Sequence, residues 1–249
     1  MTTQTNPYTV TLARSDADIR AAQNLRYSVF VEELGGDGPM VDHADRLERD
    51  AFDAHADHLI LWYQDAVVGA YRLLRDDAVP PGERFYGEAE YDLAPLHGSG
   101  RKLLELGRSC LHRDHRGGTA LFQMWQGLAR YVAEHGIEIL FGVASFHGID
   151  VAALAGPLSL LHHRHLAPEP LRVRSRVYQP MDLIAEADLD RRAAMLQMPA
   201  LIKAYLRLGG TIGDGAFIDH AFNTTDVCLI VDTARLNPAQ SAHYTRPAP

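Results

Sequence analysis

Apolar and polar residues along the chain repeat with two periods, one typical of strands and one typical of helices. Residues 8–13 alternate and are rich in β-forming side chains, so they predict a first strand. Residues 17–33 follow the helical period after Ser15 and Asp16, either of which can cap a helix, and a glycine pair follows. Two apolar runs joined by a short turn, 58–63 and 67–74, predict a β-hairpin.

The second half of the pattern alternates strands with helices. Residues 103–111 predict a strand, 119–135 a helix with one apolar face, and 137–144 a nearly continuous apolar strand. Because a strand, a helix and a strand in succession form a βαβ-like unit, we expect these two strands to run parallel. Later elements are predicted at 150–163 (helix), 171–178 (strand), 199–208 (helix) and 227–231 (strand).

The elements together predict one α/β domain. We expect a mixed, mostly antiparallel central sheet flanked by helices over residues 1–236. The segment 237–249 is rich in proline and polar residues and is predicted to be a disordered tail.

Composition narrows the class of protein. The chain has 249 residues, of which 47% are apolar and 22% charged, as in ordinary globular proteins. Its net charge of −8 argues against general nucleic-acid binding. Cys110 and Cys228 lie far apart in apolar runs, which predicts buried free thiols in a reducing compartment. We see no signal-peptide pattern and no apolar run near the ~18–20 residues of a membrane-spanning helix, and we expect a cytoplasmic protein.

The stretch from Glu105 to Gly118 concentrates candidate chemistry. A strand that carries an acid and a base, Glu105 and Arg108, leads into a charged, glycine-bearing turn and then a helix. Free backbone N–H groups and the positive end of the helix dipole favour anions at such a place. We therefore predict that His112, Arg116, Gly117 and Gly118 cradle a phosphate-bearing group.

Residues three apart in a regular strand face opposite sides of the sheet. Glu105 and Arg108 can share a site only if the strand is irregular between them, and Gly107 is a plausible place for a bulge. The alternative is that Glu105 only pairs with Arg108, or that Arg108 serves a different face.

Charged residues in the first half allow plain structural interpretations. Arg26 and Phe30 share one helical face, and a flexible arginine reaching to solvent over a core phenylalanine is the favoured interpretation. Asp50 and Asp53 lie in a long loop before two histidines, without a recognisable metal-ligand spacing. We expect solvated loop charges there, and no metal.

A strictly alternating run near residue 174 carries three arginines. As a strand it would place Arg172, Arg174 and Arg176 on one face and apolar residues on the other. A solvated strand and a docking surface for an anionic partner are equally good interpretations.

Two family resemblances extend this interpretation. The strand, basic glycine turn and helix resemble the acyl-coenzyme A-binding core of the GNAT superfamily, although Arg116-Gly117-Gly118 is a compressed form of its turn. A short turn suits a carrier protein's phosphopantetheine arm, which has one phosphate, better than coenzyme A. The order of several charged motifs also resembles the acyl-homoserine-lactone synthases, which are GNAT-like enzymes that use acyl-carrier protein: Arg26-x-x-x-Phe30, Asp50-x-x-Asp53, Gly69-x-x-Arg72 and Glu105-x-x-Arg108.

A closer resemblance is to the ornithine–acyl-carrier-protein N-acyltransferases of ornithine-lipid synthesis, and it covers nearly the whole chain. It includes residues 105–108, residues 112–118 and the distinctive residues 199–209. Its discriminating pieces, which the lactone synthases do not supply, are Gly213-Asp214-Gly215 and residues 222–227. The resemblance implies transfer of a 3-hydroxyacyl group from acyl-carrier protein to the α-amine of ornithine. The alternatives are N-acylation of another amine, lactone synthesis, or a non-catalytic acyl-binding module.

This resemblance assigns roles to the candidate residues. Glu105 would be the base that takes a proton from the amine, directly or through one water, with Arg108 beside it. The acceptor's amine needs carboxylates and its carboxylate needs a cation. Asp50, Asp53, Asp214 and Asp219 are the candidates for the first role, and Arg26 or Arg72 for the second. Phe30 and Asn223 complete the set of predicted substrate-binding residues.

The expected partners follow from the reaction. The donor would be acyl-phosphopantetheine on acyl-carrier protein, with acyl-coenzyme A less favoured and no permanently bound cofactor. The three arginines at 172–176, with Arg113 and Arg116, would dock the acidic carrier. Because the product is a lipid, contact with the inner membrane surface is a further expectation.

Overall fold

The computed structural model describes residues 6–39, 41–116 and 118–236. Its contacts divide the chain into two compact units. Among the described residues, the first unit holds those up to Leu74 together with Leu106–Gly136, and the second holds Arg75–Glu105 and residues 137–236. The single-domain boundary at residue 236 stays a prediction, and the predicted tail lies outside the described residues.

The first unit is built on antiparallel strands in the order β1, β4, β5, β7. β1 pairs with β4 and β4 with β5, both antiparallel, so the predicted hairpin is confirmed. The helix α3 packs on β1 and β4, where the Tyr131 hydroxyl donates to Asp57 at 2.6 Å. Its elements are β1 (Tyr8–Leu12), α1 (Asp16–Arg26), β2 (Val41–Asp42), β3 (Leu47–Glu48), β4 (Asp57–Tyr63), β5 (Ala66–Arg75), the later part of β7 (Leu103–Leu111) and α3 (Gly118–His135).

The first helix forms as its sequence predicts, with one change of geometry. Ser15 caps α1 by accepting a hydrogen bond from the Asp18 N–H at 3.2 Å. Ala22 and Leu25 are buried on the core side. The last part, Tyr27–Glu33, continues as a π-helix, in which the wider winding changes which side chains face the core.

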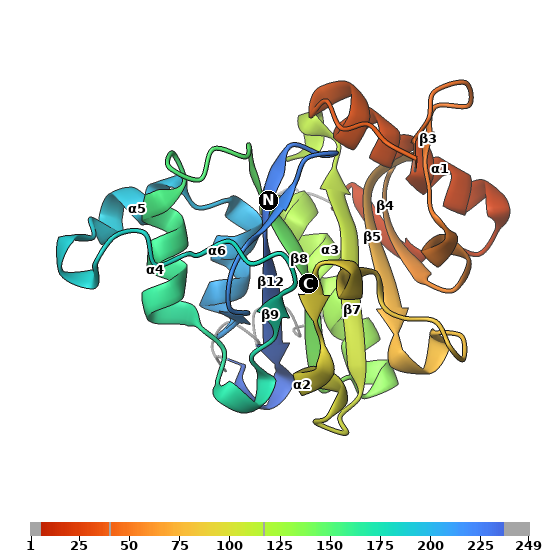
Figure 1. The fold of residues 1–249 in the computed structure, drawn as a ribbon. Coiled ribbons are helices and arrows are strands. Elements are labelled where there is room, and N and C mark those ends of the chain that lie inside the picture. The colour runs from red at the N-terminus through yellow and green to blue at the C-terminus, as the bar shows by residue number, and fades with distance from the viewer. Residues whose placement is uncertain (1–5, 40, 117, 237–249) are drawn as a thin grey trace, which may run out of the picture. The chain divides into compact units, whose positions relative to one another are not determined.

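The second unit contains the predicted parallel strand pair. Leu103–Glu105 of β7 pairs in parallel with β8, and β12 runs antiparallel to β8 and carries β10 and β11. The mixed, mostly antiparallel sheet flanked by helices is therefore confirmed. In Figure 1, α4 and α5 lie together on one side of β12. The unit's elements are β6 (Tyr91–Asp92), α2 (Ala94–His97), β8 (Ile139–His147), α4 (Ala155–His165), β9 (Arg174–Ser175), α5 (Arg191–Gln197), α6 (Ala200–Arg207), β10 (Thr211–Ile212), β11 (Phe217–Asp219) and β12 (Thr224–Asp232).

Two sequence predictions in this unit are corrected. The helix expected from residue 150 begins at Ala155, because Asp150 instead accepts from the N–H groups of Ala152 and Ala153 in a preceding turn. The strand expected over 171–178 reduces to β9, since the segment pairs with β6 over two residues only.

Two further expectations can be compared with the structure. Cys110 and Cys228 are buried free thiols, as predicted, and burial raises the pKa of Cys110 to about 12. Within the described ranges, every helix is too short or too polar to cross a membrane.

Candidate active site

The first unit gathers charged side chains from five elements into one buried cluster. The five elements are the end of α1, the strand β3, a short 3-10 helix (Ala51–Ala54) with its cap, β5 and β7, and the 3-10 helix with its cap supplies two of the residues. We call it the arginine–carboxylate ring, and it consists of Arg26, Glu48, Asp50, Asp53, Arg72 and Arg108.

The ring is closed because each carboxylate bridges two arginines. Glu48 accepts from Arg26, and from the Arg108 Nε at 2.9 Å. Asp50 accepts from Arg108 at 3.3 Å and from Arg72 at 2.5 Å. Asp53 then accepts from Arg72 at 3.1 Å and from Arg26 at 2.8 Å. The charges of the three arginines and three carboxylates cancel, which offsets the large cost of burying them.

Burial and pairing shape the electrostatics of the ring. Arg26 is only 1% exposed, so the flexible, solvent-reaching arginine expected from sequence is wrong. Burial opposes the charged form of Asp53, but Arg26 and Arg72 lower the pKa of Asp53 to about 2. The expectation of solvated loop charges is wrong for the same reason, because Asp50 and Asp53 lie inside the ring.

Sequence reasoning did not single out Glu48, although Glu48 links Arg26 to Arg108. The signal available was its position two residues before Asp50, which places three acids in the spacing E-x-D-x-x-D. Phe30 is partly buried and packs against the apolar core of the first unit. The predicted substrate-binding roles of Arg26, Phe30, Asp50, Asp53 and Arg72 stay predictions.

The strand β7 has an irregular backbone conformation at Arg108, one of the two candidate catalytic residues. Arg108 has a φ of +52°, a left-handed conformation that is rare for a residue with a side chain. The irregularity is at Arg108 and not at the glycine before it. Because both Arg108 contacts to the ring come from its guanidinium, the ring holds this strained backbone in place.

The turn after β7 carries the predicted phosphate cradle. Arg116 donates to both carboxylate oxygens of Glu33, at 2.5 and 2.7 Å, and this pairing lowers the pKa of Glu33. His112 accepts from the Asp114 N–H at 3.4 Å, which caps a short 3-10 turn. Gly118 begins α3, and Gly117 lies outside the described residues. The cradle's role in binding phosphate stays a prediction.

In the second unit, Glu105 is held by the backbone. Its carboxylate accepts from the Tyr86 N–H at 2.9 Å and from the Gly87 N–H at 2.6 Å, and the side chain is 5% exposed. Both donors lie at the start of a 3-10 helix, Tyr86–Ala89. A buried carboxylate held by backbone donors is fixed in position, and the role of Glu105 as a base stays a prediction.

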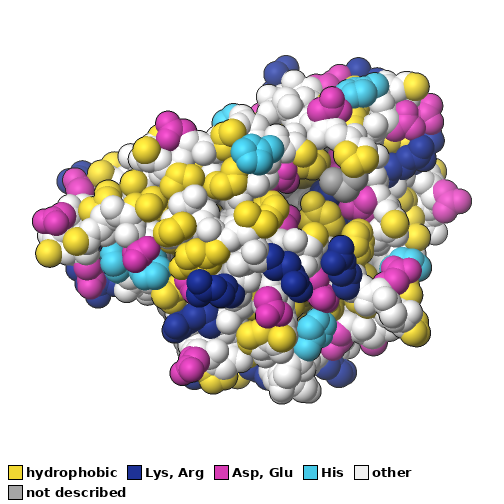
Figure 2. Space-filling model, in the orientation of Figure 1, with side chains coloured by type: hydrophobic (Ala, Val, Ile, Leu, Met, Phe, Trp, Pro, Cys, Tyr) yellow, Lys and Arg dark blue, Asp and Glu magenta, His cyan; other side chains and the backbone are white. Residues whose placement is uncertain are grey.

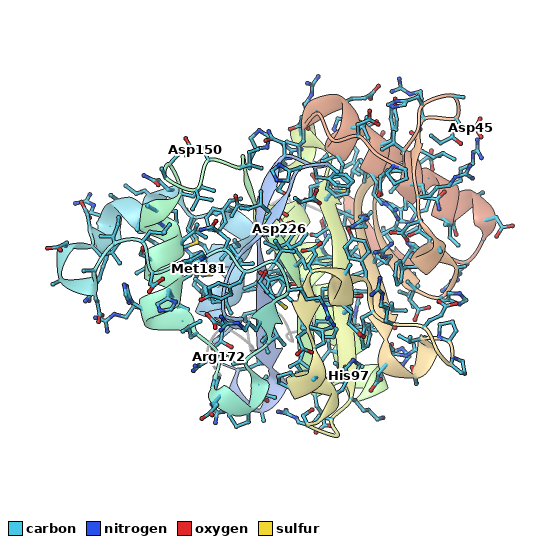
Figure 3. All side chains as sticks on the ribbon, viewed as in Figure 1. Asp45, His97, Asp150, Arg172, Met181 and Asp226 are labelled. Atoms are coloured by element: carbon cyan, nitrogen blue, oxygen red, sulfur yellow. The ribbon has the colours of Figure 1, made fainter. Side chains whose placement is uncertain are left out.

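Three carboxylates of the second unit converge beside one another. Glu90, Asp219 and Asp226 each offer an oxygen, and these oxygens all lie within 4.8 Å of one another. Glu90 and Asp226 are buried, and Asp226 lies on β12 (Figure 3). We call these residues the acidic cluster. Carboxylate oxygens at this spacing are suited to a hard cation or to an ammonium group.

The other predicted substrate ligands of this unit have contacts within the protein. Asp214 accepts from Arg174 at 2.6 Å and from the Tyr178 hydroxyl at 2.9 Å, while Arg174 stacks over the Tyr178 ring. Asn223 has a φ of +52° in the turn before β12, and its carbonyl accepts from the Gly148 N–H. Their roles toward substrate stay predictions.

The alternating arginines face outward as the sequence indicates. Arg172, Arg174 and Arg176 are exposed, and Val173 between them is fully buried. Figure 2 shows arginine and lysine side chains gathered around the position of β9. Arg172 lies at one end of this segment (Figure 3), and its Nε donates to the Ala167 carbonyl at 2.8 Å. Val177, expected on the apolar face, is instead 67% exposed.

Comparison with known proteins defines the class. Residues 25–126 match the model of the acetyltransferase (GNAT) domain. The chain is 60% identical over 246 residues to the L-ornithine N(alpha)-acyltransferase of Rhodobacter capsulatus, covering 96% of this chain and 95% of that protein. It is 40% identical to the protein of the same name from Brucella abortus, covering 94% of this chain and 88% of that protein.

A solved structure agrees in fold. The acyl-homoserine lactone synthase BjaI, described as coenzyme A-dependent, aligns with a TM-score of 0.55 at 14% identity, covering 97% of this chain and 91% of that one. The sheet and these matches define an acyltransferase of the GNAT type. Within that class, the chain belongs to the family of L-ornithine N(alpha)-acyltransferases.

Proposed function

We propose that this enzyme transfers a 3-hydroxyacyl group from acyl-carrier protein to the α-amine of ornithine and forms lyso-ornithine lipid. The relationship to L-ornithine N(alpha)-acyltransferases along almost the whole chain carries this proposal. The buried, backbone-held carboxylate of Glu105 supports it, because amide formation from a thioester needs a base.

The reaction assigns a proton path to Glu105. The α-amine is largely protonated near neutral pH, and only its neutral form attacks a carbonyl. Glu105 takes the proton, directly or through one water, while the amine nitrogen bonds to the thioester carbon. The carbon–sulfur bond then breaks, the bonded nitrogen loses its second proton, and the leaving phosphopantetheine thiolate takes up that proton. Arg108 is the second candidate catalytic residue, and the arginine–carboxylate ring fixes its guanidinium.

The acceptor is held through its charges. Ornithine has a side-chain ammonium in addition to the α-amine that reacts. We assign the side-chain ammonium to the acidic cluster, which belongs to the same unit as Glu105 and includes Asp219, a substrate ligand predicted from sequence. One oxygen from each of the three carboxylates lies within 4.8 Å of the others. Their negative charge would compensate the ammonium group for the hydration that it loses on binding at this partly buried site.

The donor is the second element of the proposal. An acidic carrier protein fits the exposed arginines at 172, 174 and 176, which lie close together in sequence and face solvent. Activity with the carrier-bound donor should therefore fall steeply with salt, because charge attraction accelerates association and salt screens it. Activity with acyl-coenzyme A at equal concentration should be much lower.

Product analysis tests the proposal directly. The enzyme is incubated with 3-hydroxyacyl-carrier protein and, separately, ornithine, lysine, glutamine and S-adenosylmethionine, and the products are detected by mass. N-acylornithine as the main product supports the proposal. An N-acyl product of another amino acid keeps the chemistry and changes the acceptor, and a lactone product changes the class of synthase. No product from any acceptor indicates an acyl-binding module.

Contact with a membrane follows from the product. Several apolar side chains of the second unit are exposed, with Leu196 at 73%, Val177 at 67% and Leu183 at 39%. Flotation with vesicles of anionic phospholipid, compared with vesicles of neutral phospholipid, measures whether the enzyme binds a bilayer. Enzyme that remains with the unbound fraction in both cases contradicts this part of the proposal.

A further inference from the structure

The backbone that holds Glu105 consists of two consecutive residues, and each serves a different oxygen. The Tyr86 N–H donates to Oε2 and the Gly87 N–H to Oε1. A carboxylate with one donor on each oxygen cannot rotate about its terminal torsion without losing both hydrogen bonds. The two N–H groups therefore set the orientation of the carboxylate plane.

The contact between the Gly87 N–H and the Glu105 carboxylate requires a residue without a side chain at position 87. A Cβ atom built on Gly87 would lie 2.9 Å from Glu105 Oε1, closer than Cβ atoms come to other atoms in real proteins. The φ of Gly87 is not in the left-handed region, so the turn itself does not require glycine. The requirement comes from the close approach of the Glu105 carboxylate to the backbone.

The turn is also supported by contacts with other segments of the same unit. Arg176 Nε donates to the Glu88 carbonyl at 2.7 Å, and the Arg176 N–H donates to the Glu90 carbonyl at 2.7 Å. Phe85, which precedes the turn, is 2% exposed and meets the Phe141 ring edge-on at 5.0 Å. These contacts fix the two N–H groups in space, which a mobile loop would not do.

We propose that the Tyr86-Gly87 turn is the positioning element of the acyl transfer, and that Gly87 is a positioning residue that acts through Glu105. The two N–H groups set the direction in which the carboxylate accepts the acceptor's proton. This inference rests on the proposed function, because it assumes that Glu105 is the base.

Removal of one N–H gives the most selective test. Tyr86→Pro deletes the donor to Oε2. Proline suits this position because Phe85 has a ψ of 154° and residue 86 is the first of its 3-10 helix. Tyr86→Ala is the matched control, since it removes the same side chain and keeps the N–H. We expect kcat of Tyr86→Pro to fall about tenfold to a hundredfold below that of Tyr86→Ala, with KM for ornithine little changed.

A double-mutant cycle tests whether Gly87 acts through Glu105. Gly87→Ala should lower kcat in the wild-type background and have no further effect in a Glu105→Gln background, because the carboxylate that it displaces is already lost. Gly156→Ala is the control, since its Cβ would make only ordinary contacts, at 3.7 Å, with Ala194 in the same unit. Thermal unfolding of every variant separates loss of folding from loss of positioning.

The outcomes separate this inference from the function on which it rests. Wild-type turnover of ornithine is measured first, and its absence overturns the proposed function together with this inference. If the wild type is active, equal kcat values for Tyr86→Pro and Tyr86→Ala overturn the inference and leave the function standing. Additive effects of Gly87→Ala and Glu105→Gln also overturn it, because Gly87 would then act by another route.

Discussion

Carboxylates are used in opposite ways in the two units. In the arginine–carboxylate ring of the first unit, three acids alternate with three arginines and the charges cancel. In the second unit, Glu105 is held by backbone N–H groups, and the acidic cluster brings like charges together. The charge-neutral ring is suited to stabilising the fold, because each of its charged side chains is paired with another side chain of the protein. A set of gathered acids is suited to a cation from outside.

The largest effect should come from Glu105. Replacement with glutamine keeps the shape of the side chain and removes the base, so turnover of ornithine should fall roughly a hundredfold to ten-thousandfold. Steady-state kinetics with mass detection measure it, and circular dichroism confirms the fold. Full turnover by Glu105→Gln would show that backbone-held Glu105 is structural, and the contrast between the units would disappear.

Removing one carboxylate of the ring should lower the free energy of unfolding more than it lowers catalytic turnover. Glu48→Gln leaves Arg26 and Arg108 facing a neutral group inside the protein, and loss of one partner of a buried pair costs about 3–5 kcal/mol. The melting temperature should fall by roughly 6 to 20 °C. Glu32→Gln is the control, because its pair with Arg46 is exposed and contributes about 0–1 kcal/mol. Equal melting temperatures for the two variants would mean that the closed ring adds no stability.

Acid should weaken the ring in a defined range. The pKa of Asp53 is about 2 in the folded protein and about 4 in an unfolded chain. A lowered folded pKa stabilises the protein above the unfolded value, and this contribution, on the order of 2 kcal/mol, is lost as pH falls from about 4 to about 2. Urea unfolding at a series of pH values measures it. Asp53→Asn should show a smaller slope in this range, and an unchanged slope would contradict the assignment.

The acidic cluster should respond differently from the ring. Asp226→Asn removes one of several like charges, so the melting temperature should stay within about 2 °C of wild type, whereas loss of one charge contact should raise KM for ornithine about tenfold. Kinetics against ornithine concentration and thermal unfolding are measured on the same preparation. A large fall in melting temperature with unchanged KM would indicate a structural cluster.

The fold was largely predictable because long apolar patterns determine long elements. The hairpin of β4 and β5 and the parallel pair of β7 and β8 follow from runs of seven or more residues. The segment around β9 alternates equally well but forms only two strand residues. Its partners are β6 and the Gly213–Gly215 loop, and neither is long enough to extend a strand.

The sequence allowed most residues of the candidate site to be named, but it did not reveal which of them contact one another. Arg26, Asp50, Asp53 and Arg72 were all singled out from sequence, yet their pairing with one another depends on distant segments. Glu48 was missed although it precedes Asp50 by two residues, because its role in joining two arginines depends on distant segments. Gly87 was missed because it acts by having no side chain, which leaves no local signal. An irregular strand was expected only if Glu105 and Arg108 share a site, and the left-handed residue is Arg108, next to the Gly107 named for a bulge.

The closed ring also sets an order of events during synthesis. Glu48 and Arg108 are 60 residues apart in the chain, and the first unit is made from two separate segments, with Arg75–Glu105 assigned to the other unit. When the ribosome has released only the residues up to Leu74, Arg26, Glu48, Asp50, Asp53 and Arg72 are present without Arg108, so the cluster carries an excess negative charge. The ring can therefore close only after Arg108 of β7 has left the ribosome.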